Sequence, residues 1–279
     1  LAMLRDLCGV PIAGVVPYTD ADIDDEDSLT GRFARDPGRG LIDIAVIRLP
    51  RISNFTDFSP LERYPSVSLR YVSRTADLRR PDMIVLPGTK STIADLLWLR
   101  QSGLEAAVLK AAAAGTLVFG VCGGYQMLGR TLADPDGAES AGQAEVSGLG
   151  LLDVDTVFAP EKIQRQTRGR LPAVSGVLAG LGGMTYEGYE IHMGRSGQNL
   201  PPLLGAGTVY GTYIHGFFDA PGIADAVLRA LCDAKGADGA CLGSFDLQSY
   251  RQEQYDKLAG AVRGGLDMGL VYRILEQGV

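Results

Sequence analysis

The sequence predicts an α/β fold: a mostly parallel β-sheet flanked by helices, with added β-strands and a helical C-terminal tail. Short apolar runs alternate with helix-like segments between residues 41 and 121, a pattern typical of parallel strands joined by crossover helices. Residues 148–213 change to strands and turns, and the chain from residue 222 onward has helical periodicity.

The composition is that of an ordinary globular protein, and it argues against nucleic-acid-binding, metal-binding, membrane-spanning and secreted proteins. Of the 279 residues, 46% are hydrophobic and 21% are charged, and the net charge is −7. The negative balance argues against a nucleic-acid partner, while two histidines and four cysteines without CxxC spacing argue against a metal site. No run is long enough to cross a membrane, and the N-terminus is unlike a secretory signal. We therefore expect a cytoplasmic protein with free thiols.

The first half of the chain contains the predicted buried strands. Four of them are short, mostly apolar runs: 9–17, 41–47, 82–87 and 116–121. The segment 67–72 is predicted as a strand because its residues alternate. A helix is predicted to open at Ser59, because Glu62 stands at capping-box spacing and proline occupies the first helical position. Residues 91–114 have helical periodicity with a break at Gly103, and the turn-rich run 36–40 predicts a domain boundary.

The second half adds strands and then helices. The strands are predicted at 149–158, 164–171, 185–192 and 208–214, and the helices at 222–233, 247–262 and 265–276.

Cys122 carries the clearest chemical signal. The apolar strand 116–121 runs into it, and a helix-compatible segment, 125–130, follows. Glycines lie two residues before and two residues after Cys122, the spacing of a nucleophile elbow. A sharp strand-to-helix turn leaves no room for side chains at those positions, and a helix N-terminus beside the sulfur favours its thiolate form. The alternative is a structural cysteine in a glycine-rich turn.

The loop 86–92 follows another predicted parallel strand and precedes a helix. It lacks the glycine spacing of a phosphate-binding P-loop. Because the carboxyl ends of parallel strands meet at one sheet edge, this loop is expected near Cys122. The amides of Gly88 and Gly123 could then form an oxyanion hole.

A thiol nucleophile needs a base, and the chain has two histidines. His215 ends a strand of apolar and small residues and precedes Gly216, so it can project into the edge that holds Cys122. His192 shares a strand face with Glu190, and a carboxylate partner there is expected to fix the imidazole rather than leave it free to transfer protons. We therefore predict His215 as the base and expect His192 to position the substrate or a domain interface.

These residues resemble the class I (triad) glutamine amidotransferases, and more narrowly the carboxyl-terminal part of the cobyric acid synthase family. The cysteine motif alone fits several amidotransferases, whereas the LPGTKSTI run and Trp98-Leu-Arg narrow the resemblance. The resemblance implies a flavodoxin-like, class I amidotransferase fold. The matching segments follow the family's order and cover most of 41–279: LPGTKSTIADLLWLR (86–100), GVCGGYQMLG (120–129), GYEIHMG (188–194), YGTYIHGFFD (210–219) and QYDKLAGAVRGGLDM (254–268).

The resemblance also assigns roles. It implies that Cys122 is the glutaminase nucleophile, that His215 is the base, and that Gln126 and His192 position the substrate, L-glutamine. One departure is Phe217, which stands where many class I members have the glutamate that orients the histidine. The narrower family generally lacks that glutamate, so the orienting residue stays open among three carboxylates: Asp219, Glu190 and Asp57.

The resemblance further implies a larger enzyme. Family members have an amino-terminal ATPase domain built like dethiobiotin synthetase, which uses ATP and Mg²⁺ to activate corrinoid carboxylates. Residues 1–38 resemble only the end of that domain, and no P-loop is present, so we expect a carboxyl-terminal fragment that binds no cofactor itself. We predict an amidotransferase domain over 39–235 and a helical tail over 236–279 that packs on it.

Three alternatives remain open at this point. Two are glutaminases of related amidoligases, namely cobyrinic acid a,c-diamide synthase and the enzyme that amidates peptidoglycan lipid II. The third is a non-catalytic, amidotransferase-like binding module, against which an intact Cys122 and His215 argue.

Overall fold

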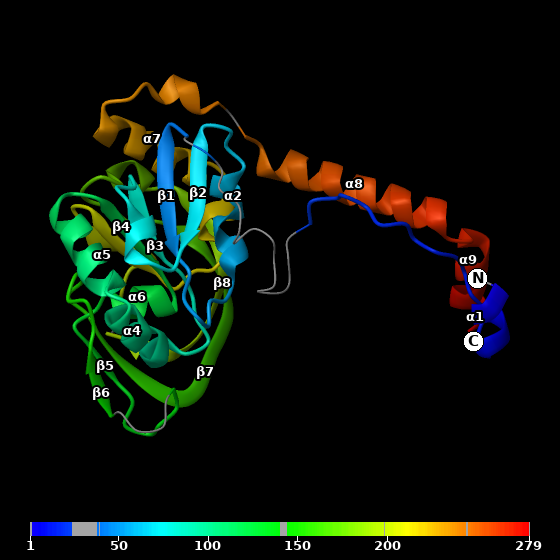
Figure 1. The fold of residues 1–279 in the computed structure, drawn as a ribbon, viewed down its shortest axis with the longest axis horizontal. Coiled ribbons are helices and arrows are strands. Elements are labelled where there is room, and N and C mark those ends of the chain that lie inside the picture. The colour runs from blue at the N-terminus through cyan, green and yellow to red at the C-terminus, as the bar shows by residue number, and fades with distance from the viewer. Residues whose placement is uncertain are drawn as a thin grey trace. The chain divides into compact units, whose positions relative to one another are not determined.

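The computed structural model describes residues 2–23, 38, 40–139, 144–197, 199–243 and 245–278. The chain divides into two compact units (Figure 1). One lies within residues 25–245, and the other combines residues 1–24 with 246–279. The predicted boundary after residue 38 falls where most residues, 24–37 and 39, are outside the described part of the chain.

A six-stranded sheet forms the centre of the larger unit. Its spatial order is β2-β1-β3-β4-β10-β9, and every pair is parallel except the last. This confirms the predicted mostly parallel α/β sheet. The strands are β1 (Ile42–Ile47), β2 (Val67–Val72), β3 (Met83–Leu86), β4 (Leu117–Val121), β9 (Leu204–Ala206) and β10 (Val209–Thr212).

A second sheet of four strands has the order β6-β5-β7-β8. Its members are β5 (Thr131–Ala133), β6 (Glu145–Ser147), β7 (Asp155–Arg170) and β8 (Thr185–Ser196). The sequence predicted two strands, 149–158 and 164–171, but the structure has the single strand β7 with an irregularity between Phe158 and Ile163. Most of β7 beyond the irregularity is exposed, so it carries no apolar alternation that could reveal its continuity.

Helices cover both faces of the parallel sheet (Figure 1). Gly103, in the left-handed region at φ 77°, separates α4 from α5 as predicted. The predicted helix at Ser59 is present but continues directly from a 3₁₀ turn, without a capping side chain. The α-helices of this unit are α2 (Ser59–Glu62), α3 (Thr75–Leu78), α4 (Thr92–Gln101), α5 (Leu104–Ala113), α6 (Gly123–Met127) and α7 (Ile223–Lys235); the 3₁₀ turns are η2 (Phe55–Phe58), η3 (Ala179–Leu181), η4 (Phe217–Asp219) and η5 (Gly239–Leu242).

Strand β1 shows why these apolar runs were recognisable. Ile42, Ile44 and Val46 belong to the core cluster on one face of the sheet, while Ala45 and Ile47 belong to the cluster on the other. All five side chains are fully buried. A strand covered on both faces has to be apolar at nearly every position, which is the pattern in the sequence.

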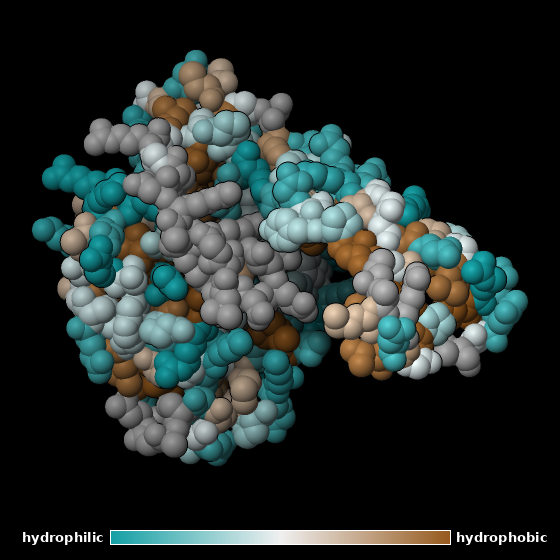
Figure 2. Space-filling view, turned by 45° about the vertical axis from the view of Figure 1, so that its right-hand side comes forward, coloured by the Kyte–Doolittle hydropathy of each residue, from teal (hydrophilic) through white to brown (hydrophobic). Residues whose placement is uncertain are grey.

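The smaller unit contains α1 (Ala2–Leu7), α8 (Leu247–Gly265) and α9 (Met268–Gln277). Residues 9–17 were predicted as a buried strand; this was wrong, because they form one isolated bridge, Gly14 to Leu266, and Val10 and Val15 are exposed. Prolines at both ends of the run cannot donate to a ladder. Other large side chains of this unit are also exposed: Met3, Leu7, Tyr272 and Leu275. Figure 2 shows brown, hydrophobic surface on this unit.

The residues that the structure describes bear on the expectations for membrane spans, metal sites and thiols. None of their helices is both long and apolar enough to span a membrane. They contain no group of three or more histidine, cysteine or acidic residues arranged to hold a metal ion. The four cysteines carry free thiols, and Cys122 and Cys232 are buried.

Candidate active site

Cys122 occupies the corner between β4 and α6 in a strained backbone conformation. Its φ is 51° and its ψ is −109°, a region that non-glycine residues rarely adopt. A Cβ on Gly120 would lie 2.7 Å from the backbone of Tyr125, and one on Gly124 would lie 1.9 Å from the carbonyl oxygen of Leu86. The structure therefore has the tight elbow that the two glycines predicted, although α6 begins at once after Cys122.

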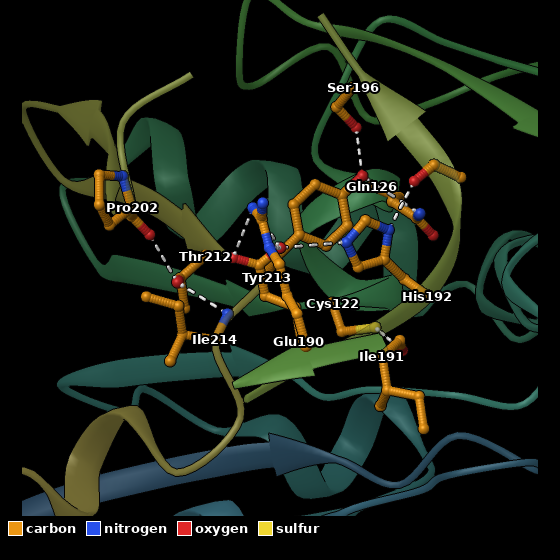
Figure 3. A network of polar contacts seen from close by, with 12 residues as sticks. Cys122, Gln126, Glu190, Ile191, His192, Ser196, Pro202, Thr212, Tyr213 and Ile214 are labelled. Atoms are coloured by element: carbon orange, nitrogen blue, oxygen red, sulfur yellow. Dashed lines mark hydrogen bonds and ion pairs between the residues drawn. The ribbon is translucent and has the colours of Figure 1, made fainter. Parts of the chain in front are cut away.

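The thiol of Cys122 lies within the protein rather than on its surface. The residue is 7% exposed, and its Sγ lies 3.6 Å from the carbonyl oxygen of Ile191 on β8 (Figure 3). Gly123 is the first residue of α6, so its amide has no acceptor within the helix. A hydrogen-bond donor without a helical acceptor therefore directly follows Cys122 in the chain.

His215 follows β10 and is 1% exposed. Its backbone pairs with that of Tyr189, whose ring stacks on the imidazole with centroids 5.2 Å apart. A Cβ on Gly88 would lie only 3.2 Å from Cε1 of His215, so the loop after β3 reaches this histidine. The structure thus brings together the ends of β3, β4 and β10, as the parallel topology predicted.

Asp57, on the 3₁₀ turn η2, is the carboxylate that contacts His215. Its Oδ2 lies 2.7 Å from Nδ1 of His215, and its Oδ1 accepts a hydrogen bond of 2.9 Å from the amide of Gly216. Burial of His215 opposes the charged imidazolium, but the interactions with Asp57 and with Cys122 outweigh it and raise the pKa of His215 to about 10. The structure thus favours the charged imidazole at this position.

Of the other two carboxylates considered as orienters, Glu190 contacts the other histidine. It forms an ion pair of 2.9 Å with Arg165 and lies 3.5 Å from Nε2 of His192. Asp219 ends η4, where its amide donates to the carbonyl of Gly216.

His192 lies in β8 and stacks on Tyr213, with ring centroids 3.8 Å apart (Figure 3). Its Nδ1 lies 2.6 Å from the carbonyl oxygen of Gly194, which requires a proton on Nδ1. Burial lowers the pKa of His192 and exceeds the opposing effects of Gly194 and Glu190, and Arg165 lowers it further. His192 is therefore held as a neutral ring.

Gln126 lies on α6, one turn after Cys122, and is 2% exposed. Its Oε1 accepts a hydrogen bond of 2.9 Å from the hydroxyl of Thr92, and its Nε2 donates one of 3.2 Å to the hydroxyl of Tyr213. Tyr213 in turn lies 2.5 Å from the hydroxyl of Ser196. This chain of hydrogen bonds fixes the wall beside the thiol.

A cavity of about 390 Å³ opens over the thiol and takes in both histidines. This volume lies in the range of small-molecule sites. Three charged residues that were not predicted as parts of the site also line it. The full lining is Ser53, Asn54, Thr89, Lys90, Thr92, Cys122, Gln126, Glu139, Lys162, Ile191, His192, Met193 and His215.

Sequence reasoning missed the charged residues Lys90, Glu139 and Lys162 as parts of the site. Glu139 follows the short strand β5 in a loop without periodicity, and Lys162 lies at the irregularity of β7. Lys90 lies in the loop 86–92, which was expected near Cys122. Its position in that loop could therefore have identified it as part of the site.

Comparison with curated proteins finds relatives named cobyric acid synthase. The protein of that name from Lachnoclostridium phytofermentans is 51% identical and is matched over 100% of this chain and 60% of its own length. The corresponding protein from Ruminiclostridium cellulolyticum is 47% identical, over 100% of this chain and 58% of its own length. The chain therefore spans about 60% of the length of these relatives.

Comparison with solved structures finds matches at lower sequence identity. A crystal structure of a glutamine amidotransferase is 18% identical with a TM-score of 0.46, covering 70% of this chain and 99% of its own. The structure of PurLQS from Thermotoga maritima is 17% identical with a TM-score of 0.47, covering 68% and 99%. The model of the CobB/CobQ-like glutamine amidotransferase domain matches residues 43–223, from the second residue of β1 to the first residue of α7. This range includes Cys122 and both histidines. This chain belongs to the CobB/CobQ-like glutamine amidotransferase family.

Proposed function

We propose that this chain is the glutaminase part of a cobyric acid synthase. It would hydrolyse L-glutamine and supply ammonia for the ATP-dependent amidation of corrinoid carboxylates, with adenosylcobyrinic acid a,c-diamide as substrate. The observation that carries the glutaminase is the strained Cys122 beside His215, with Asp57 at 2.7 Å from that imidazole. The relatives' shared name supports the corrinoid substrate. We place the enzyme in the cytoplasm.

The first half of the reaction forms a thioester. The Cys122 thiolate attacks the side-chain carbonyl carbon of glutamine, and the carbonyl π electrons move onto oxygen. The amides of Gly123 and Gly88 stabilise that oxyanion. When the tetrahedral intermediate collapses, the C–N bond breaks and the imidazolium of His215 gives its Nε2 proton to the leaving nitrogen, which departs as ammonia.

The second half releases glutamate. Neutral His215 removes a proton from water, the resulting hydroxide attacks the thioester carbonyl, and the C–S bond breaks to restore the thiolate. Asp57 acts as a positioning residue, because it holds the Nδ1 proton of His215 and leaves Nε2 for the interaction with Cys122. Gln126 and His192 shape the wall against which glutamine lies.

The rest of the protein would use ATP and Mg²⁺ to activate a corrinoid carboxylate, which ammonia then converts to an amide. Its residues lie outside this chain under the proposal, and the share of the relatives' length that remains unmatched leaves room for such a domain.

The experiment has two arms. Glutamate release from L-glutamine by this chain, together with covalent labelling of Cys122 by diazo-oxo-norleucine, tests the glutaminase. Mass spectrometry of the corrinoid after reaction with the full-length protein, ATP, Mg²⁺ and glutamine tests the ligase, since each amidation replaces a hydroxyl by an amino group. Amidation of lipid II or of the a- and c-carboxylates instead would redirect the proposal to a related amidoligase, and binding of glutamine without hydrolysis would make the chain a binding module.

A further inference from the structure

Glu139 is a carboxylate in the Cys122 cavity that the proposed chemistry does not use. It is half-buried and lies in the loop after β5. Its Oε2 accepts a hydrogen bond of 2.6 Å from the amide of Thr92, the first residue of α4. Ser91, at the N-cap position of that helix, makes no capping bond with its side chain. Glu139 therefore caps α4 from a distant loop.

The charge of Glu139 is poorly compensated by the protein. Desolvation raises its pKa, Asp134 and Asp95 act in the same direction, and only the amides of Thr92 and Ile93 oppose them. Within the described ranges no lysine or arginine forms an ion pair with Glu139. A half-buried carboxylate near two other acids is stabilised by a cation that enters the cavity.

The same cavity is also lined by positively charged side chains. Lys90 and Lys162 line it, both are exposed, and neither has an ion-pair partner among the residues that the structure describes. One carboxylate and two ammonium groups match the α-ammonium and α-carboxylate of a zwitterionic amino acid. A simple amide would leave Glu139 without a cation.

Thr92 places Glu139 close to the nucleophile's helix. Its amide donates to Glu139, and its hydroxyl donates to Gln126, one turn after Cys122 on α6. A Cβ on Gly123 would lie 3.1 Å from the Thr92 hydroxyl oxygen. The cavity wall thus runs from the thiol through Thr92 to Glu139.

We propose that Glu139 binds the α-ammonium group of glutamine and makes the site selective for amides that carry an α-amine. This inference rests on the proposed glutaminase function and adds to it the residue that recognises the end of the substrate remote from the reacting amide. The oxygen lone pairs not used by Thr92 and Ile93 are the acceptors.

The test compares two substrates in three proteins. L-Glutamine is compared with glutaramate, which has the same side-chain amide and the same carboxylate but no amine. Glu139→Gln removes the charge while its amide oxygen can still cap α4. Glu145→Gln, an exposed carboxylate on β6, is the matched control. Thermal melting checks that each variant is folded.

We expect the KM for glutamine to rise about 10- to 100-fold in Glu139→Gln, the size of one lost charge-assisted hydrogen bond, with kcat nearly unchanged. The KM for glutaramate should stay as in the wild type, so the preference for glutamine falls by the same factor. A purely capping role predicts instead that Glu139→Gln keeps the wild-type preference, and that result overturns the inference while leaving the glutaminase intact. If the unchanged chain neither binds nor hydrolyses glutamine, the proposed function fails first and the inference fails with it.

Discussion

The two histidines of this chain are both buried and both lie near a carboxylate, yet their surroundings favour opposite charge states. His215 lies 2.7 Å from Asp57, and its pKa is raised to about 10. His192 lies 3.5 Å from Glu190, and its pKa is lowered, chiefly by burial. Proximity to an acid therefore does not by itself identify a catalytic base.

The difference arises from what else each carboxylate contacts. Asp57 accepts from His215 and from the neutral amide of Gly216, so its negative charge acts on the imidazole. Glu190 is already paired with the cationic Arg165. A carboxylate that is neutralised elsewhere cannot offset the cost of burying an imidazolium. This contrast supports His215 as the base and His192 as a neutral, positioning ring.

Loss of the nucleophile is expected to have the largest effect. Cys122→Ala should abolish glutamate release and labelling by diazo-oxo-norleucine, because no other described thiol lies beside His215. In the full-length protein, high ammonium should still support ATP-dependent amidation. Cys241→Ala, which removes an exposed thiol, is the control and should behave as wild type. Unchanged glutamate release by Cys122→Ala would contradict the assignment.

The second-largest effect is expected to be a difference in kcat between substitutions of the two carboxylates, Asp57 and Glu190. Asp57→Asn is expected to lower the glutaminase kcat by about 10²- to 10⁴-fold, since an amide can impose the wrong imidazole tautomer. Glu190→Gln should change kcat by less than about tenfold, because His192 transfers no proton under this account. Steady-state kinetics on both variants makes the comparison, and equal losses would remove the distinction between the two pairs.

The electrostatic explanation can be tested directly at His192. Arg165→Ala leaves Glu190 without its cation, so the pKa of His192 should rise, while kcat should change only slightly. Because the chain has only two histidines, NMR titration of the imidazole signals can follow each one, with His215→Asn to assign them. A pKa of His192 that does not move would show that burial alone sets it.

Stability should depend on pH in opposite directions at the two sites. For His215, whose folded pKa is raised, the stabilisation is complete below the ordinary value of 6.5 and is lost as pH rises toward about 10. For His192, whose folded pKa is lowered, stabilisation is present above 6.5 and is lost as pH falls below it.

This prediction is the smallest in size, a shift of a few degrees in Tm. Melting curves of wild type, His215→Asn and His192→Asn from about pH 5 to 10 check it. The advantage of wild type over His215→Asn should shrink toward high pH, and its advantage over His192→Asn should shrink toward low pH. Parallel trends in the two variants would speak against the assigned directions.

The sequence predicted those elements whose environment leaves a regular pattern. Strands β1, β3 and β4 are buried on both faces, so each is a mostly apolar run, and the elbow at Cys122 needs glycines at fixed offsets. The position of His215 at the same edge followed from parallel topology.

The remaining parts depend on tertiary contacts that no local pattern encodes. Asp57 is held between the apolar Phe55 and Phe58 on a short turn far from His215 in sequence, so nothing distinguished it from Asp219 and Glu190. Glu139 reaches the cavity only because its loop folds back to α4. The partner of residues 9–17, at Leu266, lies at the opposite end of the chain.

The central claim is that Cys122 works with His215 and not with His192, and paired substitution tests it most directly. Asparagine can replace the Nδ1–H donor of either ring but cannot accept and return a proton at the Nε2 position. Glutaminase kcat should fall by about 10³-fold or more in His215→Asn and by less than about tenfold in His192→Asn. A loss of several orders of magnitude in His192→Asn with a mild effect in His215→Asn would contradict the account and reverse the roles of the two histidines.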